Sequence, residues 1–258
     1  MLMVVSPAKS LDFTSRHPQK SLTSPQFIEQ AAQLVEIMRQ KEVAQIVELM
    51  GVSEAIAQLN FVRFQTWQTQ PALEELSKAA VYAFNGDVYE GLDIQSLGES
   101  AQTYIGTHLR ILSGLYGVLR PFDALQAYRL EMGLPLANPA GKNLYAFWGD
   151  RVTQALQVDI DAMHAPFLLN LASEEYFKVV RPKLLSVPVV TPSFLDYKNG
   201  KYKIISFYAK RARGLMARYC AEKKIKRVDQ IKRFSLEGYA YCEEASSEYA
   251  PVFKRRIE

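Results

Sequence analysis

The chain has 258 residues, 48% of them hydrophobic and 22% charged, and a formal net charge of +4, which is typical of soluble globular proteins. No apolar run approaches the roughly 20 residues that span a bilayer, so a membrane-spanning protein is excluded. Two cysteines are too few for a disulfide framework, and no basic residue precedes the apolar start as a signal peptide requires. We therefore expect a cytoplasmic protein.

The first residues, Met1–Val5, have the pattern of a short buried strand that ends at Ser6-Pro7. Polar residues just past the carboxyl end of a central strand often line a ligand crevice, so Ser6 and Lys9 are candidate site residues. Helices are predicted next. One begins at Ser24-Pro25, one closes at Gly51, one runs from Ser53 to about Trp67, and a fourth begins at Pro71.

A second buried strand is predicted at Val81–Phe84, and it leads into Asn85-Gly86-Asp87-Val88-Tyr89. Asn-Gly-Asp is typical of turns. Two interpretations stay open, a functional loop that carries Asp87 and Tyr89, or a well-formed turn without a ligand.

The stretch 112–123, LSGLYGVLRPFD, follows a helical pattern in which His108 lies on the apolar face. Gly114 and Gly117 permit a tight turn, and backbone N–H groups there, with Arg110 and Arg120, could contact an anion. The stretch resembles the hairpin of a helix-hairpin-helix, although its glycines are three residues apart rather than two. An ordinary tight turn between helices is the alternative.

Further polar candidates follow in chain order. Residues 128–133 alternate as an extended segment that places Arg129 and Glu131 on one side. A helix is predicted over 144–156. A third strand is predicted at 166–171, with Asn170 near its end and Ser173 as the cap of the next helix.

The C-terminal part reads as a β-hairpin around Asn199-Gly200, then a helix, then two strand-like runs at 234–241 and 249–254. From Gly200 onward there are 15 basic and 7 acidic residues, a net of +8, which leaves 16 basic and 20 acidic residues, a net of −4, for the rest. The helix carries an apolar stripe, and its other face has four basic residues, Lys210, Arg211, Arg213 and Arg218. This region is a candidate surface for an anionic partner.

The scattered strands and helices predict a single α/β domain over residues 1–258, with a mixed sheet. The sequence has no phosphate-binding loop, dinucleotide fingerprint or zinc-spaced set of cysteines and histidines, so we expect no metal and no cofactor. Asp159, Asp161 and His164 are interpreted as a solvated loop at a helix end.

Seven segments together resemble the YaaA family of bacterial peroxide-stress-resistance proteins. They are SPAKSLD at 6–12, FNGDVYEGL at 84–92, LSGLYGVLRPFD at 112–123, YRLEMG at 128–133, LYAFWGD at 144–150, NLASEEYFK at 170–178 and ISFYAKRARGLMARY at 205–219. The resemblance implies a cytoplasmic protein that limits hydrogen peroxide damage, linked to lowered free iron. It also implies a single α/β domain with a basic cleft, described as cantaloupe-like, and DNA binding through that cleft and a helix-hairpin-helix-like element.

Two functions from different classes follow. The first is a monomeric protein that binds duplex or branched DNA through its backbone, using Arg110, Gly114, Gly117, Arg120 and the four basic helix residues. The second is an enzyme on a small or nucleotide-like anionic substrate at a polar cluster of Ser6, Lys9, Asp87, Tyr89, Arg129, Glu131, Asn170 and Ser173. Direct iron sequestration is a third interpretation, against which the sparse ligand set argues.

Overall fold

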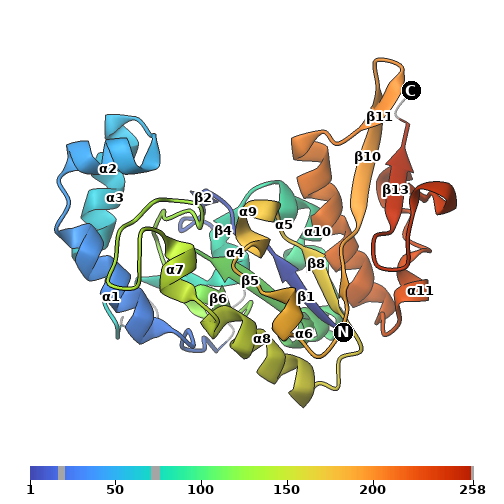
Figure 1. Cartoon of the computed structure of the whole chain (residues 1–258), viewed down its shortest axis with the longest axis horizontal. Coiled ribbons are helices and arrows are strands. Elements are labelled where there is room, and N and C mark those ends of the chain that lie inside the picture. The colour runs from blue at the N-terminus through green and yellow to red at the C-terminus, as the bar shows by residue number, and fades with distance from the viewer. Residues whose placement is uncertain (17–20, 71–75, 257–258) are drawn as a thin grey trace.

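A five-stranded sheet built around the N-terminal strand organises the computed structural model, which describes residues 1–16, 21–70 and 76–256 (Figure 1). Its order is β6 (Gly117–Leu119), β5 (Leu109–Ser113), β1 (Leu2–Val5), β8 (Leu168–Leu171) and β9 (Val189–Val190). β1 runs parallel to β5 and β8, β9 runs parallel to β8, and β6 is antiparallel to β5. The predicted buried strand at the N-terminus is confirmed. All four residues of β1 are buried, as expected of a central strand covered on both faces.

The N-terminal helices lie together at one end of the molecule in Figure 1. They are α1 (Ile28–Arg39), α2 (Val43–Met50) and α3 (Glu54–Thr66). α1 begins three residues later than Pro25 and has no side-chain cap, so Ser24 does not cap it. α2 ends as predicted at Gly51, whose φ of 60° suits a residue without a Cβ. The helix predicted from Pro71 falls in residues 71–75, outside the described part of the chain.

The prediction of a strand at Val81–Phe84 is wrong for all but its last residue. Residues Ala80–Ala83 form the helical turn α4, and β4 (Phe84–Asn85) alone pairs with β2 (Ser10–Leu11). The Ala80 and Val81 amides donate to the carbonyls of Asp123 and Pro121, so the turn is satisfied by another segment rather than by a strand ladder. A further small sheet joins β3 (Ser77–Ala79) to β7 (Ala124–Gln126).

The stretch compared above with a helix-hairpin-helix is instead a buried β-hairpin. α6 (Glu99–His108) ends at His108, and β5 and β6 then flank the turn Gly114–Tyr116. The indole N–H of Trp148 donates to the Gly114 carbonyl at 2.9 Å. A Cβ at Gly114 would lie 2.1 Å from the Leu130 carbonyl oxygen, so this glycine lets the turn touch the 128–131 segment. Periodicity failed here because the helical spacing of apolar residues continues past the end of α6 to Leu109 and Leu112, which lie in β5.

The helix predicted over 144–156 is divided in two. α7 (Leu144–Trp148) ends at Gly149, which has a φ of 52°, and α8 (Arg151–Ala162) starts anew. Two short helices, α9 (Glu174–Phe177) and η2 (Pro182–Leu184), follow β8. Two more, η3 (Leu236–Gly238) and η4 (Glu243–Ala245), lie in the C-terminal region. Ser173 precedes α9 as predicted, but its side chain makes no cap hydrogen bond.

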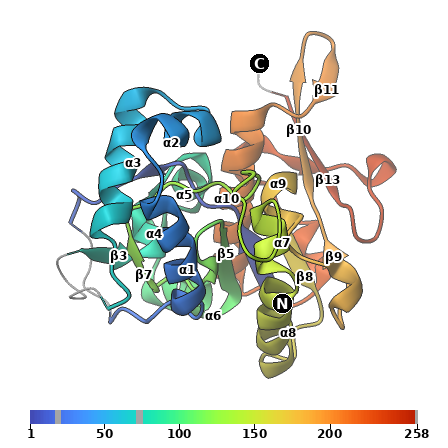
Figure 2. The same cartoon turned by 60° about the vertical axis from the view of Figure 1, so that its left-hand side comes forward.

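The C-terminal sheet lies at the other end of the molecule from α1–α3, and its β10–β11 hairpin projects outward (Figures 1 and 2). Its order is β11 (Lys201–Lys203), β10 (Ser193–Lys198), β13 (Val252–Arg255) and β12 (Ala240–Tyr241). The predicted hairpin is confirmed, with Asn199 and Gly200 at φ of 56° and 80°. On its buried side Arg255 Nε donates to Asp196 Oδ1 at 2.6 Å, and the Tyr239 hydroxyl donates to Asp196 Oδ2 at 2.9 Å.

Helix α10 (Ser206–Lys223) connects this sheet to the rest of the fold and packs against α5 (Asp87–Leu92). In the chain, η1 (Ile94–Ser96) follows α5, and α11 (Val228–Ile231) follows α10. One continuous cluster of buried apolar side chains runs from Met1 to Phe253, so the sheets and helices share a core. Among the described residues no helix is long and apolar enough to cross a membrane.

Candidate functional site

A cavity of about 240 Å³ lies where β1 and β8 end, facing α5 and α10. Its lining brings together five of the predicted site residues, which are Ser6, Lys9, Asp87, Tyr89 and Ser173. The same cavity is also lined by residues that the sequence did not single out for it, namely Pro7, Ala8, Ser10, Asn85, Gly86, Val88, Glu175, Tyr176, Lys210 and Arg213. This edge of the sheet therefore collects polar groups from four separate stretches of the chain.

Ser6 and Ser173 hold the floor of the cavity together. The Ser6 hydroxyl donates to Ser173 Oγ at 3.2 Å and accepts from the Ser173 backbone N–H at 2.8 Å. The Tyr89 hydroxyl donates to the Ser6 carbonyl at 3.1 Å. Burial raises the pKa of Tyr89 well above its usual value, with further contributions from Tyr128 and Tyr176, so its hydroxyl stays a donor. These bonds fix the end of β1 against the start of α9.

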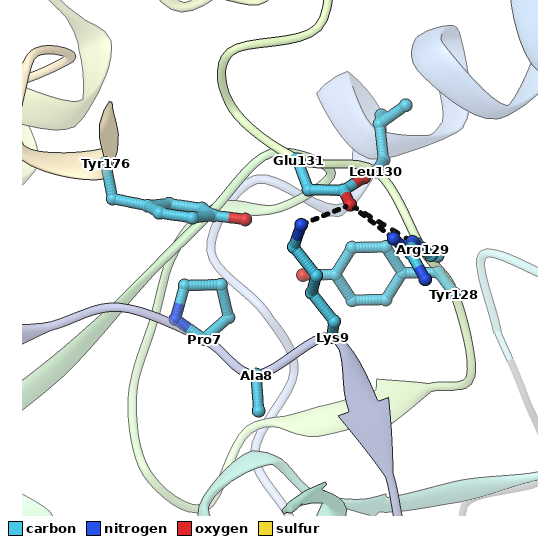
Figure 3. Close-up of a pocket in the computed structure, with 8 residues that line it drawn as sticks. All are labelled: Pro7, Ala8, Lys9, Tyr128, Arg129, Leu130, Glu131 and Tyr176. Atoms are coloured by element: carbon cyan, nitrogen blue, oxygen red, sulfur yellow. Dashed lines mark hydrogen bonds and ion pairs between the residues drawn. The ribbon is translucent and has the colours of Figure 1, made fainter. Parts of the chain in front are cut away.

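A smaller chamber adjoins the cavity and contains Arg129 and Glu131 (Figure 3). The two spaces share Pro7, Ala8, Lys9 and Tyr176 as lining. Glu131 Oε1 lies 3.5 Å from Lys9 Nζ and 3.0 Å from an Arg129 Nη, and Arg129 Nε donates to it at 3.1 Å. The predicted alternation of residues 128–133 is thus reflected in an ion pair between Arg129 and Glu131.

Two cations of α10 face the cavity from the opposite side. Lys210 is exposed and Arg213 is half-buried, and neither has a hydrogen bond or ion pair to any described residue. Burial lowers the pKa of Arg213 from its usual value, which reflects a charge held partly away from water. Their position depends on the close approach of α5 and α10 at Gly91 and Gly214, where Cβ atoms would lie 2.2 Å and 1.9 Å from carbonyl oxygens of the other helix.

Asn170 is the predicted cleft residue that the structure places elsewhere. Its side chain is 6% exposed on β8, accepts from the Ala172 N–H at 3.0 Å and donates to Thr191 Oγ1 at 3.3 Å. These contacts occupy both the oxygen and the nitrogen of the side-chain amide. The side chain is buried in the fold and does not line the cavity. Asn170 therefore shapes the turn after β8.

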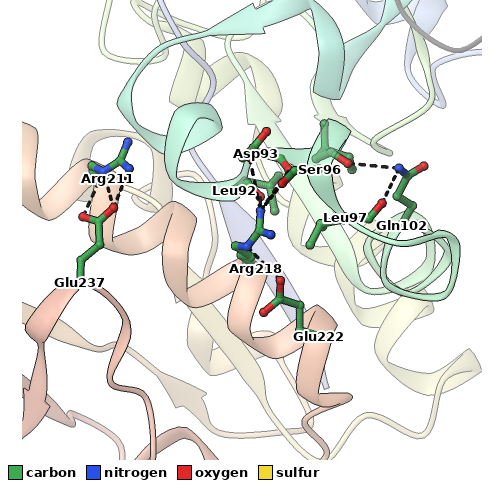
Figure 4. Close-up of polar contacts among 10 residues, drawn as sticks. Leu92, Asp93, Ser96, Leu97, Gln102, Arg211, Arg218, Glu222 and Glu237 are labelled. Atoms are coloured by element: carbon green, nitrogen blue, oxygen red, sulfur yellow. Dashed lines mark hydrogen bonds and ion pairs between the residues drawn. The ribbon is translucent and has the colours of Figure 1, made fainter.

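Two of the α10 residues proposed for DNA, Arg211 and Arg218, are already bound to acidic or polar groups (Figure 4). Arg211 Nε donates to Glu237 at 2.9 and 3.1 Å, and its Nη2 lies 2.5 Å from the same carboxylate. Arg218 lies 2.9 Å from Glu222 and donates to Ser96 Oγ at 2.7 Å. The net positive charge of this helix face is consequently smaller than its sequence suggests.

The residues proposed for the glycine turn differ in their access to solvent. Arg110 is 6% exposed and donates to Asp159 Oδ2 at 2.6 Å, and Gly114 and Gly117 are buried, so these three residues do not present a surface to DNA in this structure. Arg120 is exposed. Asp159 is thereby assigned to a structural ion pair. Among the described residues no group of three or more His, Cys, Asp or Glu side chains is placed to hold a metal ion.

Comparison with known proteins identifies the protein family of this chain. The profile of the family described as "Peroxide stress protein YaaA" matches residues 1–245. The chain belongs to this family. It is 54% identical over 257 residues to a UPF0246 protein of Janthinobacterium sp. (strain Marseille), covering 100% of this chain and 99% of that protein. It is 55% identical over 256 residues to a UPF0246 protein of Ralstonia nicotianae, covering 99% of both.

Within this YaaA-family chain, sequence reasoning missed the contribution of α10 to the cavity. The sequence pattern places Lys210 and Arg213 with Arg211 and Arg218 on the one face opposite the apolar stripe and does not separate them. The signal that separates them is the pair Gly91 and Gly214, because two glycines in amphipathic helices indicate a close crossing that turns part of the basic face inward. Glu175 and Tyr176 lie two and three residues after Ser173, so their place in the cavity lining could be predicted together with that of Ser173.

Proposed function

We propose that this protein serves peroxide-stress resistance by binding a small, nucleotide-like anionic compound in the cavity between β1, β8 and α10. The observation that carries the proposal is Arg213, a half-buried guanidinium that lines the cavity without a partner among the described residues. Lys210 and Lys9 line the same space. Three cations around one cavity favour an anionic ligand.

The partial burial of Arg213 has an energetic cost. Withdrawing a charge from water without a compensating partner is unfavourable, so a free guanidinium in a cavity favours any ligand that supplies the missing anion. A phosphate group suits a guanidinium with an ammonium beside it, because the guanidinium binds two oxygens at once. A volume near 240 Å³ suits a small molecule more than a polymer.

The acidic and hydroxyl groups of the cavity restrict which anionic ligands it can bind. Asp87 and Glu175 line it together with Ser10 and Tyr176. Carboxylates near a phosphate site disfavour a compound that is anionic throughout, and they favour one with hydroxyl or amino groups away from its phosphate. Nucleotides and sugar phosphates have this composition.

The test compares Arg213→Met with Arg211→Met, a matched control on the same helix that loses the same charge outside the cavity. Binding of inorganic pyrophosphate and of a nucleoside monophosphate is measured by calorimetry and by thermal shift. Wild type and Arg211→Met should bind alike, and Arg213→Met should lose about tenfold or more in affinity. Absence of binding to the wild type, or equal binding by Arg213→Met, would contradict the proposal.

The same variants test the link to peroxide stress in cells. In a strain that lacks the protein, Arg211→Met should restore growth under hydrogen peroxide as well as wild type does, and Arg213→Met should restore less. Equal abundance of the two variants must be verified by immunoblot, because a destabilised variant is also degraded faster.

DNA binding is the second candidate, and the charge of the C-terminal quarter favours it. Its net of +8 contrasts with −4 for the rest of the chain. On the projecting hairpin, Lys198 and Lys201 are exposed beside Tyr202, whose ring is covered by the Lys254 ammonium at 5.0 Å. Basic side chains that neutralise phosphates give binding without sequence preference.

The DNA candidate is tested with the double variant Arg211→Glu and Arg218→Glu, which changes the proposed helix outside the cavity. Duplex binding should weaken alike for all sequences, and the slope of log affinity against log salt should flatten by about 0.9 for each phosphate that the variant no longer neutralises. Circular dichroism verifies folding. Unchanged affinity and slope in a folded double variant would remove this helix face from the DNA candidate, leaving Arg120 and the hairpin lysines.

A further inference from the structure

One oxygen of the Glu131 carboxylate is buried and has no hydrogen-bond partner among the described residues. Glu131 is 7% exposed, and while Oε1 contacts Lys9 and Arg129, Oε2 contacts no donor (Figure 3). A buried carboxylate oxygen normally accepts one or more hydrogen bonds, because leaving it unpaired is energetically unfavourable. The fold retains this unfavourable group beside a ligand cavity.

The chamber that Glu131 lines has room for one small group. Its volume is about 10 Å³, close to the space that one water molecule requires. The walls are partly apolar, from Pro7, Ala8 and Leu130, and the tyrosines Tyr128 and Tyr176 close two sides. The Tyr128 hydroxyl is already bonded to Ser113 Oγ at 2.6 Å. The chamber thus accommodates a hydroxyl or an amino group, but not a ring or a phosphate.

Glu131 also lies in reach of the main cavity through Lys9. The Lys9 side chain lines both spaces and is 66% exposed, so its ammonium is free to move between Glu131 and a ligand. Arg129 holds Glu131 from the other side by two donors. A carboxylate held in this way offers its second oxygen only as an acceptor.

We propose that Glu131 Oε2 accepts a hydrogen bond from a hydroxyl or amino group of the ligand while Arg213 and Lys210 hold its phosphate. The inference rests on the proposed function and narrows it to phosphate esters that carry a second, hydrogen-bond-donating group. The donor enters the chamber in place of water and satisfies the unpaired oxygen. A ligand without such a donor would leave the carboxylate unpaired and bind less tightly.

Three phosphate monoesters separate the possibilities when their affinities are measured by calorimetry. Ribose 5-phosphate offers hydroxyl groups, phosphoethanolamine offers an amino group, and methyl phosphate offers neither. Wild type should bind at least one of the first two about tenfold more tightly than methyl phosphate. This comparison needs no variant. Equal affinity for all three esters would overturn the inference.

Glu131→Gln then assigns the preference to its residue, with the exposed Glu90→Gln as the control for loss of one negative charge. Glu131→Gln should abolish the preference for the donor-bearing ester and change methyl phosphate affinity by less than about threefold, whereas Glu90→Gln should keep the preference. A folded Glu131→Gln that retains the preference would also overturn the inference, yet leave the proposed function intact. If wild type binds none of the three esters, both this inference and the proposed function are wrong.

Discussion

Gly214 in α10 lies directly against the Val88 carbonyl in α5, so close that a Cβ at this glycine would be 1.9 Å from the oxygen. The contact is reciprocal, since a Cβ at Gly91 would be 2.2 Å from the Arg211 carbonyl oxygen. This crossing sets how far Arg213 extends over the end of β1. The two glycines therefore control the geometry of the cavity as well as the packing of the helices.

Gly214→Ala should destabilise the fold by about 3 kcal/mol, because the added methyl group meets backbone atoms that cannot yield without moving a helix. Urea unfolding followed by circular dichroism measures the change. Gly98→Ala is the control, since it has an ordinary φ of −62° and no atom within 4 Å of its added Cβ. A Gly214→Ala variant as stable as Gly98→Ala would refute this helix crossing.

Gly117→Val should reduce stability by at least about 3 kcal/mol. Gly117 has a φ of +68°, which a β-branched residue avoids, and its Cβ would lie 2.7 Å from the Trp148 ring. Thermal unfolding measures the loss. Any decrease in DNA binding by this variant would therefore report damage to the fold. A Gly117→Val variant with wild-type stability would mean that the turn is not buried as described.

Arg255→Met should cost about 3–5 kcal/mol of stability. Removing the guanidinium leaves Asp196, which is 1% exposed, as an uncompensated charge in the C-terminal sheet. Arg256→Met is a neighbouring control at an exposed position. Chemical denaturation at neutral pH measures both. The double variant Arg255→Met with Asp196→Asn should recover part of the loss, and failure of any recovery would argue against a charge effect.

His108 should make the protein less stable in mild acid. Burial lowers the pKa of His108 below its usual value of 6.5, with nearby Lys224 and Arg110 also opposing its protonation. The unfolded chain then binds more protons than the folded chain as pH falls through 6.5, so stability decreases with falling pH in that window. His108→Gln should show a shallower decrease between pH 7.5 and 5.5 in urea unfolding. Identical pH profiles would exclude His108 as the source.

Purified protein should hold less than stoichiometric iron after dialysis. No described cluster combines three metal-ligating side chains, and soft or imidazole ligands are sparse in the sequence. Elemental analysis measures the iron content per chain. One tightly held iron per chain would require a site that residues 1–16, 21–70 and 76–256 do not form.

The sequence predicted elements best where a single rule decides. The strand β1 (Leu2–Val5) follows from the continuous apolar run at the N-terminus, and the β10–β11 hairpin follows from Asn199-Gly200. The rules failed where tertiary contacts decide. Ala80–Ala83 forms a helical turn because the carbonyls of Asp123 and Pro121 accept hydrogen bonds from the Ala80 and Val81 amides, and these partners lie 43 and 40 residues further along the chain.

The site was partly predictable for the same reason. Ser6, Asp87 and Ser173 each follow a strand or a turn, and local pattern alone marks that position. The direction of a basic helix face depends on how its neighbour packs, so Arg213 could not be separated from Arg211 by spacing. The single unpaired oxygen of Glu131 depends on three-dimensional contacts that no pattern encodes.

The place of β1 between β5 and β8 delays completion of the sheet during synthesis. Leu2–Val5 leave the ribosome first, but one of the two partners, Leu168–Leu171, is made more than 160 residues later. At about 5–20 residues per second this delay is roughly ten to thirty seconds. During that time a wholly apolar segment stays without one neighbouring strand, and a nascent chain of this protein would be a natural client for ribosome-associated chaperones.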